Sequence, residues 1–154
     1  MRTAVRAIIV HEDALLVTHR NKFGNEYDVL IGGGVNLGET LEQALFRELR
    51  EEGGVRITNP RLVFMEQAGD PYGMQYIFLC DYAGGQPALA PDSDEYAINA
   101  LGQNLYQPMW RKLGELPAVE FRSERLKQAI LHGLAAGFPA EPLDITHWPS
   151  YTKI

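Results

Sequence analysis

The chain has 154 residues, with 45% hydrophobic and 22% charged residues, and its length suits one domain with a buried core. No apolar run approaches the roughly 18 residues of a membrane span, and the net charge of −6 disfavours nonspecific binding to a nucleic-acid backbone. A single cysteine, Cys80, excludes an intrachain disulfide and a multi-cysteine zinc site. We therefore expect one cytoplasmic domain over residues 1–154, with neither a membrane nor a nucleic-acid polymer as partner.

The N-terminal third predicts strands. Residues 5–10 and 14–17 are apolar and rich in β-formers, and the polar residues between them predict a hairpin. A polar segment follows at residues 18–26, with Gly24-Asn25 as its turn signal. Residues 27–31 predict another strand, which ends in three consecutive glycines.

The remainder predicts further strands and a closing helix. Strands are expected over residues 61–67, 74–82 and 105–111. Residues 84–102 are rich in Gly, Pro, Ala and Asp, which indicates a long loop of the kind that often serves function. Residues 123–132 predict a helix with Ser123 as its N-cap, and the tail from about residue 137 has no predicted element.

A helix is also predicted directly after the glycines. Thr40 and Gln43 have the spacing of a capping box, and Gly53-Gly54 provides a C-terminal stop. At about 100° per residue, Leu45 and Leu49 belong to one apolar stripe that faces the core.

Three glutamates of this helix, Glu48, Glu51 and Glu52, occupy unfavourable positions. Glu48 and Glu52 share the azimuth of the apolar stripe, and Glu51 flanks it. All three lie in the C-terminal half, where the macrodipole disfavours an anion by about 0.3–1 kcal/mol. Arg47 is spaced to pair with Glu51 alone. A hard divalent cation such as Mg²⁺ or Mn²⁺ would resolve the conflict, whereas a solvated acidic face is the alternative for the helix by itself.

The helix and the preceding loop together have a characteristic spacing. The order is Gly33, five residues, Glu39, seven residues, Arg47-Glu48-Leu49, one residue, Glu51-Glu52, one residue, Gly54-Val55. This run closely resembles the signature of the Nudix hydrolases, the family of MutT-like proteins. The resemblance implies an α/β fold, specifically an α/β/α sandwich with a mixed β-sheet. It also implies Mg²⁺- or Mn²⁺-dependent hydrolysis of a pyrophosphate bond in a nucleotide-containing substrate.

Roles follow from the resemblance, position by position. Glu48 and Glu52 are implied as the principal metal ligands, and Glu51 as a further ligand or the group that activates water. The carbonyl of Gly32 or Gly33 would complete the metal shell, and we select Gly33. Asn36 stands where an acidic residue is frequent, but that departure removes no implied ligand.

Two supporting roles are implied in the same way. Arg47 would orient a catalytic carboxylate through charge-assisted hydrogen bonds, and Glu39 would support the site or add a metal contact. Some members of the family draw another acidic group from a downstream loop, and we select Glu95 over its neighbours Asp92 and Asp94.

Other features leave alternatives open. Arg20 follows an apolar strand and is a candidate for binding substrate phosphate, with surface solubility as the alternative. A Nudix-like domain that senses a nucleotide without cleaving it is the rival function, although such domains usually show damage in the signature. The resemblance also allows a homodimer and does not choose the nucleotide substrate.

Overall fold

The computed structural model describes residues 2–149, so residues 150–154 of the tail lie outside the described residues. No helix in that range is long and apolar enough to cross a membrane. The strands are β1 (Thr3–His11), β2 (Ala14–Lys22), β3 (Asn25–Val29), β4 (Ile31–Gly34), β5 (Val55–Gln67), β6 (Met74–Gly85), β7 (Asn104–Lys112) and β8 (Leu143–Asp144). The helices are α1 (Leu41–Glu48), the π-helical turn η1 (Leu49–Gly53), α2 (Asp94–Asn99), the 3₁₀ helix η2 (Leu113–Ala118) and α3 (Glu124–Ala136).

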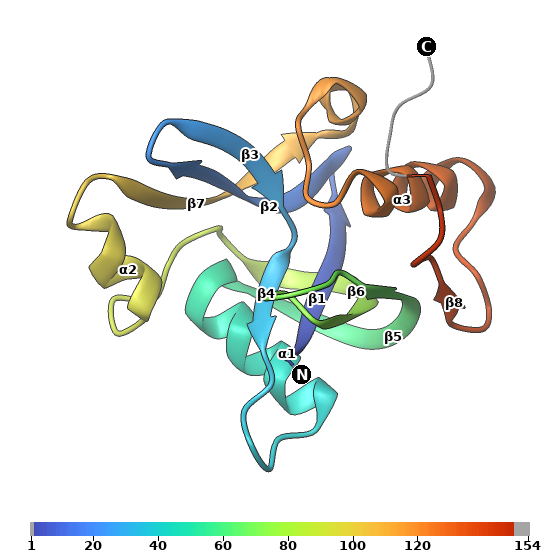
Figure 1. Cartoon of the computed structure of the whole chain (residues 1–154), viewed down its shortest axis with the longest axis horizontal. Coiled ribbons are helices and arrows are strands. Elements are labelled where there is room, and N and C mark those ends of the chain that lie inside the picture. The colour runs from blue at the N-terminus through green and yellow to red at the C-terminus, as the bar shows by residue number, and fades with distance from the viewer. Residues whose placement is uncertain (1, 150–154) are drawn as a thin grey trace.

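Strand pairing among these residues gives one mixed sheet of eight strands. β1 is central and pairs in parallel with β6 along one side. On its other side β1 pairs antiparallel with β4 over residues 4–7 and with β2 at residues 10–11. β2 continues away from β1 and pairs with β3 and β7. The sheet therefore divides beside β1, and Figure 1 shows β2, β3 and β7 above β4.

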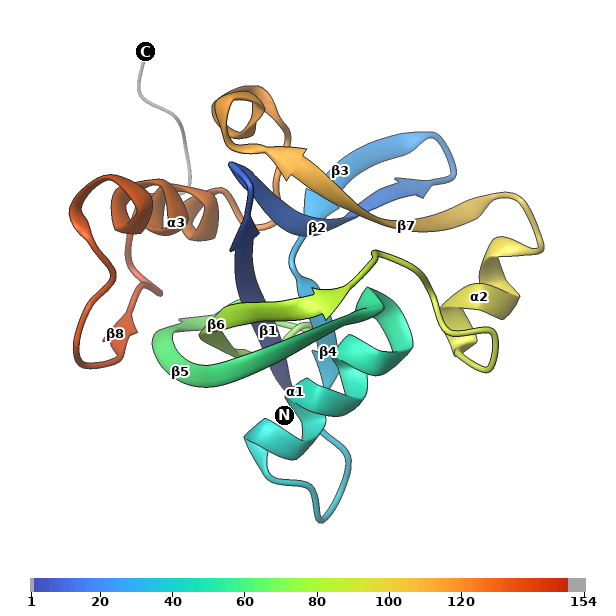
Figure 2. The same cartoon turned by 180° about the vertical axis from the view of Figure 1, so that it is seen from behind.

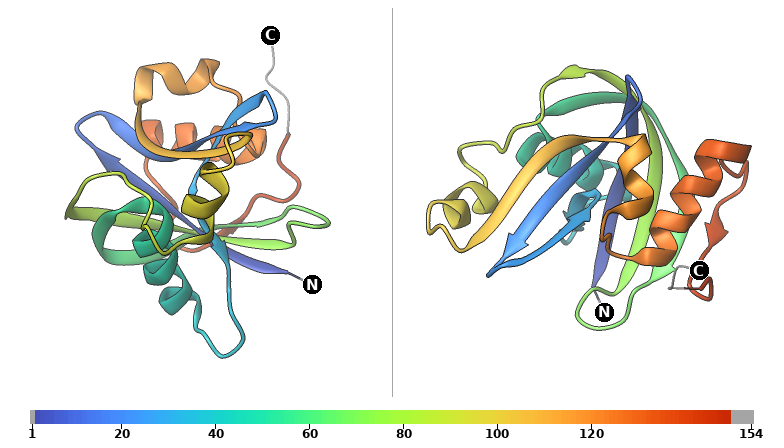
Figure 3. Two further views of the ribbon diagram at one scale, coloured as in Figure 1. Left: turned by 90° about the vertical axis from the view of Figure 1, so that its left-hand side faces the viewer. Right: turned by 90° about the horizontal axis from the view of Figure 1, so that it is seen from above.

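Helices cover both faces of the sheet. Val5 and Ile9 of β1 pack in one buried cluster with Leu45 of α1. Ile8 packs in a second cluster with Ile130 of α3. Successive side chains of a strand point to opposite faces, so α1 and α3 lie on opposite sides of the sheet (Figures 2 and 3). The predicted α/β/α sandwich with a mixed sheet is confirmed.

Most predicted elements are present, and several are longer than the sequence indicated. The N-terminal hairpin is β1 and β2, and the two middle strands are β5 and β6, paired antiparallel. The strand at 105–111 is β7, which joins the sheet beside β2. The closing helix is α3, and the Ser123 hydroxyl accepts a hydrogen bond from the Leu126 amide, as an N-cap does.

The prediction of one strand over residues 27–31 was wrong. The chain breaks at Leu30 into β3, which pairs with β2, and β4, which pairs with β1. The Leu30 carbonyl accepts a hydrogen bond of 3.1 Å from Nη1 of Arg6. The preceding polar segment is also mostly strand, because its turn is confined to Phe23 and Gly24, whose φ angles are +54° and +91°.

The prediction of an unstructured loop over residues 84–102 was also wrong. β6 extends to Gly85, and α2 forms within the segment, with the Ser93 hydroxyl as N-cap for the Tyr96 amide. The tail contains a short strand, β8, parallel to β5. Ile145 is fully buried, and Trp148 packs against the cluster that includes α3. These contacts attach the described part of the tail to the domain.

Candidate active site

The acidic helix begins and ends as the sequence predicted. The Thr40 hydroxyl accepts from the Gln43 amide, and the Gln43 side chain accepts from the Thr40 amide, which completes the capping box. Gly54 ends the helix with φ +75°. Residues 49–53 form a π-helical turn rather than α-helix. A π turn is wider than an α turn and is frequent at functional sites, and here it carries two of the three glutamates.

Two of the three glutamates face the interior. Glu48 is 6% exposed and Glu52 is 9% exposed, next to Leu45 and Leu49 of the buried stripe. The Glu51 side chain is 24% exposed. The arrangement inferred from the helical wheel is therefore confirmed, since the carboxylates share the buried side of the helix instead of forming a solvated face.

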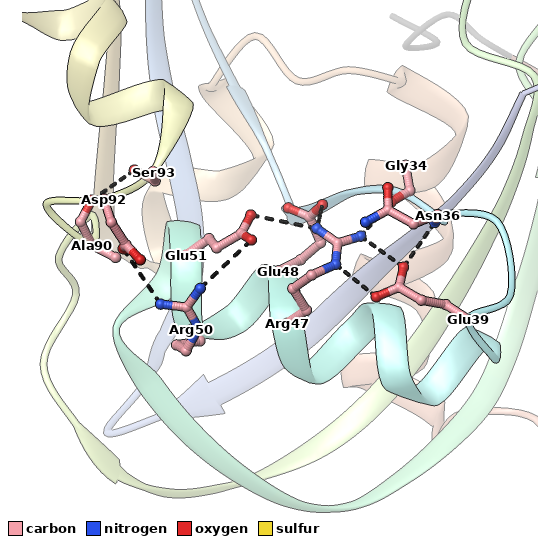
Figure 4. Close-up of polar contacts among 10 residues, drawn as sticks. All are labelled: Gly34, Asn36, Glu39, Arg47, Glu48, Arg50, Glu51, Ala90, Asp92 and Ser93. Atoms are coloured by element: carbon pink, nitrogen blue, oxygen red, sulfur yellow. Dashed lines mark hydrogen bonds and ion pairs between the residues drawn. The ribbon is translucent and has the colours of Figure 1, made fainter.

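Arg47 joins the carboxylates to one another (Figure 4). Its Nε donates to Glu39 Oε2 at 2.7 Å, and its Nη1 donates to Glu48 Oε1 at 2.8 Å and lies 3.4 Å from Glu51 Oε2. Its Nη2 donates to the Gly34 carbonyl at 2.8 Å. Glu39 and Glu48 raise the pKa of Arg47, and the hydrogen bonds that Arg47 donates to Glu39 make the largest contribution. One guanidinium thus orients three acidic groups and the glycine-rich loop.

Glu39 fastens that loop to the helix. Besides its two bonds from Arg47, Glu39 Oε1 accepts from the Asn36 amide at 2.8 Å. The hydrogen bond from Arg47 and the amide of Asn36 lower the pKa of Glu39 to about 2. Because its oxygens are engaged by Arg47 and the backbone, Glu39 supports the geometry of the site at this position.

The backbone at Gly33 lies directly against Glu48. A Cβ atom on Gly33 would lie 2.6 Å from Glu48 Oε1 and 2.8 Å from Oε2. Real Cβ contacts are essentially never that short. A larger residue at position 33 would therefore displace the Glu48 carboxylate, which lies close to the loop backbone.

Burial and like charge strongly perturb the two inward glutamates. Burial, together with the neighbouring Glu48 and Glu95, raises the pKa of Glu52 to about 9. Burial also raises the pKa of Glu48, although Arg47 opposes that shift. Glu95 comes from α2, and its side chain is hydrogen bonded to Glu52. The structure thus brings Glu95 into the site, whereas Asp92 lies outside it and pairs with Arg50 at 3.4 Å.

Arg6 is a neighbour of this group that sequence reasoning missed. Its half-buried guanidinium donates to the Leu30 carbonyl and to Gln75 Oε1 at 3.1 Å each. Burial lowers the pKa of Arg6, and the charges of Glu52 and Glu48 oppose the shift. A charged residue in the middle of the apolar β1 was the available signal, because such a position is rarely charged without a partner.

Arg20 lies on the β2–β3–β7 branch and is engaged with protein groups. Its guanidinium stacks on the Tyr106 ring at 3.7 Å from the centroid. It also donates to the Leu105 carbonyl at 3.1 Å and to the Asn104 side chain. Burial raises the pKa of Tyr106, and Arg20, Glu95 and other charges also act on it. Sequence reasoning did not select Tyr106.

The donor set fits a hard divalent cation, although the side chains are not arranged around one. Within residues 2–149, no three or more His, Cys, Asp or Glu side chains surround a position that could hold a metal ion. Instead, Glu48 and Glu51 contact Arg47, and Glu52 bonds to Glu95. A bound cation would replace the proton that burial and repulsion hold on Glu52.

Comparison with known proteins agrees with this geometry. The model of the NUDIX domain matches residues 1–126. Curated relatives include NAD-capped RNA hydrolases NudC from Pectobacterium atrosepticum, 43% identical over 74 residues, and from Photobacterium profundum, 32% identical over 108 residues. These matches cover 48% and 70% of this chain but only 28% and 36% of the relatives. The chain therefore spans about a third of the length of the curated relatives it matches.

Solved structures share the fold. An ADP-ribose pyrophosphatase from Streptococcus suis aligns with a TM-score of 0.65 and 18% identity over 93% of this chain and 98% of that one. A MutT protein from Bacillus halodurans aligns with a TM-score of 0.62 and 20% identity over 89% of this chain and 84% of that one. At these identities the likeness concerns the fold alone. Because the domain model covers most of the chain and the signature is complete from Gly33 to Val55, this protein belongs to the Nudix family.

Proposed function

We propose that this protein hydrolyses a phosphoanhydride bond in a substrate that contains a nucleoside diphosphate, with Mg²⁺ or Mn²⁺ as cofactor. The observation that carries the proposal is the burial of Glu48 and Glu52 beside Glu95. Anionic side chains are rarely buried without a compensating charge. Arg47 and Arg6 compensate part of this charge, and a divalent cation would compensate the rest.

The chain offers a coherent set of groups for the cation. We assign Glu48, Glu52 and Glu51 as its carboxylate ligands and the Gly33 carbonyl as a further oxygen ligand. Carboxylate and carbonyl oxygens are the ligands that Mg²⁺ and Mn²⁺ prefer. When bound, the cation would neutralise charge on the pyrophosphate and lower the pKa of a bound water. Arg47 would hold Glu48 and Glu51 in place through the contacts described above.

The reaction that suits these groups is attack by water on phosphorus. The water oxygen bonds to one phosphorus atom, the bond from that phosphorus to the bridging oxygen breaks, and the water's proton passes to a carboxylate. Glu51 is our candidate for that carboxylate because it is partly exposed and Arg47 orients it. Glu95 is the alternative, since it reaches the same site from α2. Arg20 would contribute positive charge to the substrate at the Tyr106 side.

The substrate is a nucleotide derivative in this proposal. The names of the relatives concern NAD-capped RNA and ADP-ribose. This supports a panel of nucleoside triphosphates, nucleotide sugars, ADP-ribose, NAD and an NAD-capped RNA oligonucleotide. Turnover of the capped RNA by this chain would contradict our expectation, drawn from its negative charge, that no nucleic-acid polymer is a partner.

The test is turnover of that panel with Mg²⁺, followed as phosphate released after phosphatase coupling. Replacing Glu52 by Gln removes a charge with little change in volume, and we expect turnover to fall at least a hundredfold. Glu42→Gln is the matched control, because Glu42 is exposed in the first turn of the same helix. Equal turnover by the Glu52 variant and the wild-type protein would refute the ligand assignment.

The rival function, nucleotide sensing without cleavage, predicts a different result. A sensor would bind a panel nucleotide by calorimetry and release no phosphate from any of them. The signature retains Glu51 and Glu52, and Arg47 contacts both Glu48 and Glu51. These features favour catalysis, because a sensor has no need of a water-activating carboxylate.

A further inference from the structure

Helix α2 carries Glu95 to the site without an apolar anchor. None of its residues, Asp94–Asn99, is buried. Figure 1 shows the helix at the edge of the molecule, next to the start of β7 and away from α1 and α3. A helix of this length has little stability by itself, and most helical stability in proteins comes from packing an apolar face. Specific polar contacts must therefore hold α2, and with it Glu95, in position.

Asn99 provides such a contact at the C-terminal end of α2. Its Nδ2 donates to the Tyr106 carbonyl at 2.8 Å, and its Oδ1 accepts from the Tyr106 amide at 2.7 Å. The side-chain amide therefore satisfies both backbone groups of one strand residue, as a neighbouring strand would. The same Tyr106 packs its ring on Arg20, the candidate residue for binding substrate phosphate.

Contacts before the helix are of a different kind. The Ala90 amide donates to the Glu51 carbonyl at 2.8 Å and holds the approaching chain against η1. Asp92 and Arg50 form an exposed ion pair at 3.4 Å, and such pairs stabilise little. These contacts hold the chain just before α2, whereas the Asn99 contact holds the C-terminal end of α2. Glu95 lies between the two along the chain.

We propose that Asn99 is a positioning residue that fastens α2 to β7 and thereby holds the Glu95 carboxyl beside Glu52. The inference rests on the proposed function where it concerns turnover, and on the geometry alone where it concerns α2. Loss of the Asn99 amide frees the helix to detach while the sheet and the core, to which α2 contributes no buried residue, stay intact.

The first test is hydrogen exchange, which requires neither substrate nor metal. Asn99→Ala removes two hydrogen bonds, so local opening of α2 should become about thirtyfold more frequent. We expect the Ala97 and Leu101 amides, which bond within the helix and its final turn, to exchange correspondingly faster by NMR. Amides of β1 and β6 should not change. Gln103→Ala is the matched control, because Gln103 is an exposed amide residue between α2 and β7.

The second test is a double-mutant cycle in turnover, using the panel substrate that the wild-type protein hydrolyses fastest. Asn99→Ala should lower kcat about tenfold, and Glu95→Gln should lower it by at least as much. If Asn99 acts through Glu95, the double variant should be no slower than Glu95→Gln alone. A residue that merely stabilised the fold would multiply the two losses and would also lower Tm.

Each result decides the inference. Unchanged exchange in α2 after Asn99→Ala, or multiplied losses in the cycle, would overturn it. If the wild-type protein hydrolyses none of the panel, the proposed function fails. The exchange measurement, together with a structure of the Asn99→Ala variant that shows whether Glu95 has left Glu52, then decides the positioning role separately.

Discussion

Replacing Glu52 by Gln should stabilise the metal-free protein while it removes turnover. The carboxyl is 9% exposed, and burial together with Glu48 and Glu95 raises its pKa from 4.5 to about 9. Below pH 4.5 the group is protonated in both the folded and the unfolded chain. As the pH rises above 4.5, the unfolded chain loses the proton and the folded chain keeps it. The free energy of unfolding therefore falls with rising pH until the folded pKa is reached.

The magnitude follows from the slope of about 1.4 kcal/mol per pH unit for one proton. From pH 4.5 to pH 7.5 the wild-type protein should lose about 4 kcal/mol from this group, with less where water relaxes the buried charge. The amide introduced by Glu52→Gln does not titrate, so at pH 7.5 we expect that variant to have the higher Tm, by about 8–16 °C.

The assay is thermal unfolding of both proteins in EDTA from pH 5 to pH 8.5, repeated with Mg²⁺. The difference in Tm should widen with pH in EDTA. Mg²⁺ should raise the Tm of the wild-type protein. At a hundredfold excess over its Kd, the ion should increase the free energy of unfolding by about 2.7 kcal/mol, and it should affect the variant less. Curves for the two proteins that remain parallel at every pH would refute the reasoning, because Glu52 would then have an ordinary pKa in the folded chain.

Three further substitutions test the support of the site. Gly33→Ala would place a Cβ 2.6 Å from Glu48 Oε1, so kcat should fall at least tenfold while Tm changes by only a few degrees; an unchanged kcat would contradict the close approach. Arg47→Lys should lower kcat by about 10–100-fold and the free energy of unfolding by about 2 kcal/mol, measured by urea titration, because an ammonium cannot span the same carboxylates. Gly54 has φ +75°, and a Cβ there would lie 2.5 Å from the Gln86 carbonyl oxygen. Gly54→Ala should therefore lower the free energy of unfolding by about 2–3 kcal/mol in the same titration. A loss smaller than about 1 kcal/mol would argue against that backbone conformation.

Local spacing in the sequence was sufficient to predict the acidic helix. Its capping box, its glycine stop and the inward azimuth of Glu48 depend on residues within a few turns of one another, and the periodicity of a helix fixes them. The pairing of Arg47 with Glu51 has the same local origin. The family signature lies in this one continuous run, so the order of residues along the chain is enough to indicate the family.

Contacts between distant segments depended on the tertiary structure. The break at Leu30 arises because β3 and β4 pair with different strands. Local sequence does not predict which strand another strand will pair with. Helix α2 is short and has no buried residue, so its sequence lacks the apolar periodicity that predicts a helix.

Some residues of the site were predictable from local sequence, and others were not. Sequence determined that one helix would carry Glu48, Glu51 and Glu52, because their spacing is a property of the helix itself. Only the tertiary structure brought Arg6 of β1 and Glu95 of α2 to that helix. Packing across the divided sheet decides which charges become neighbours, and a charge acquires its shifted pKa from neighbours in space and from burial rather than from its position along the chain.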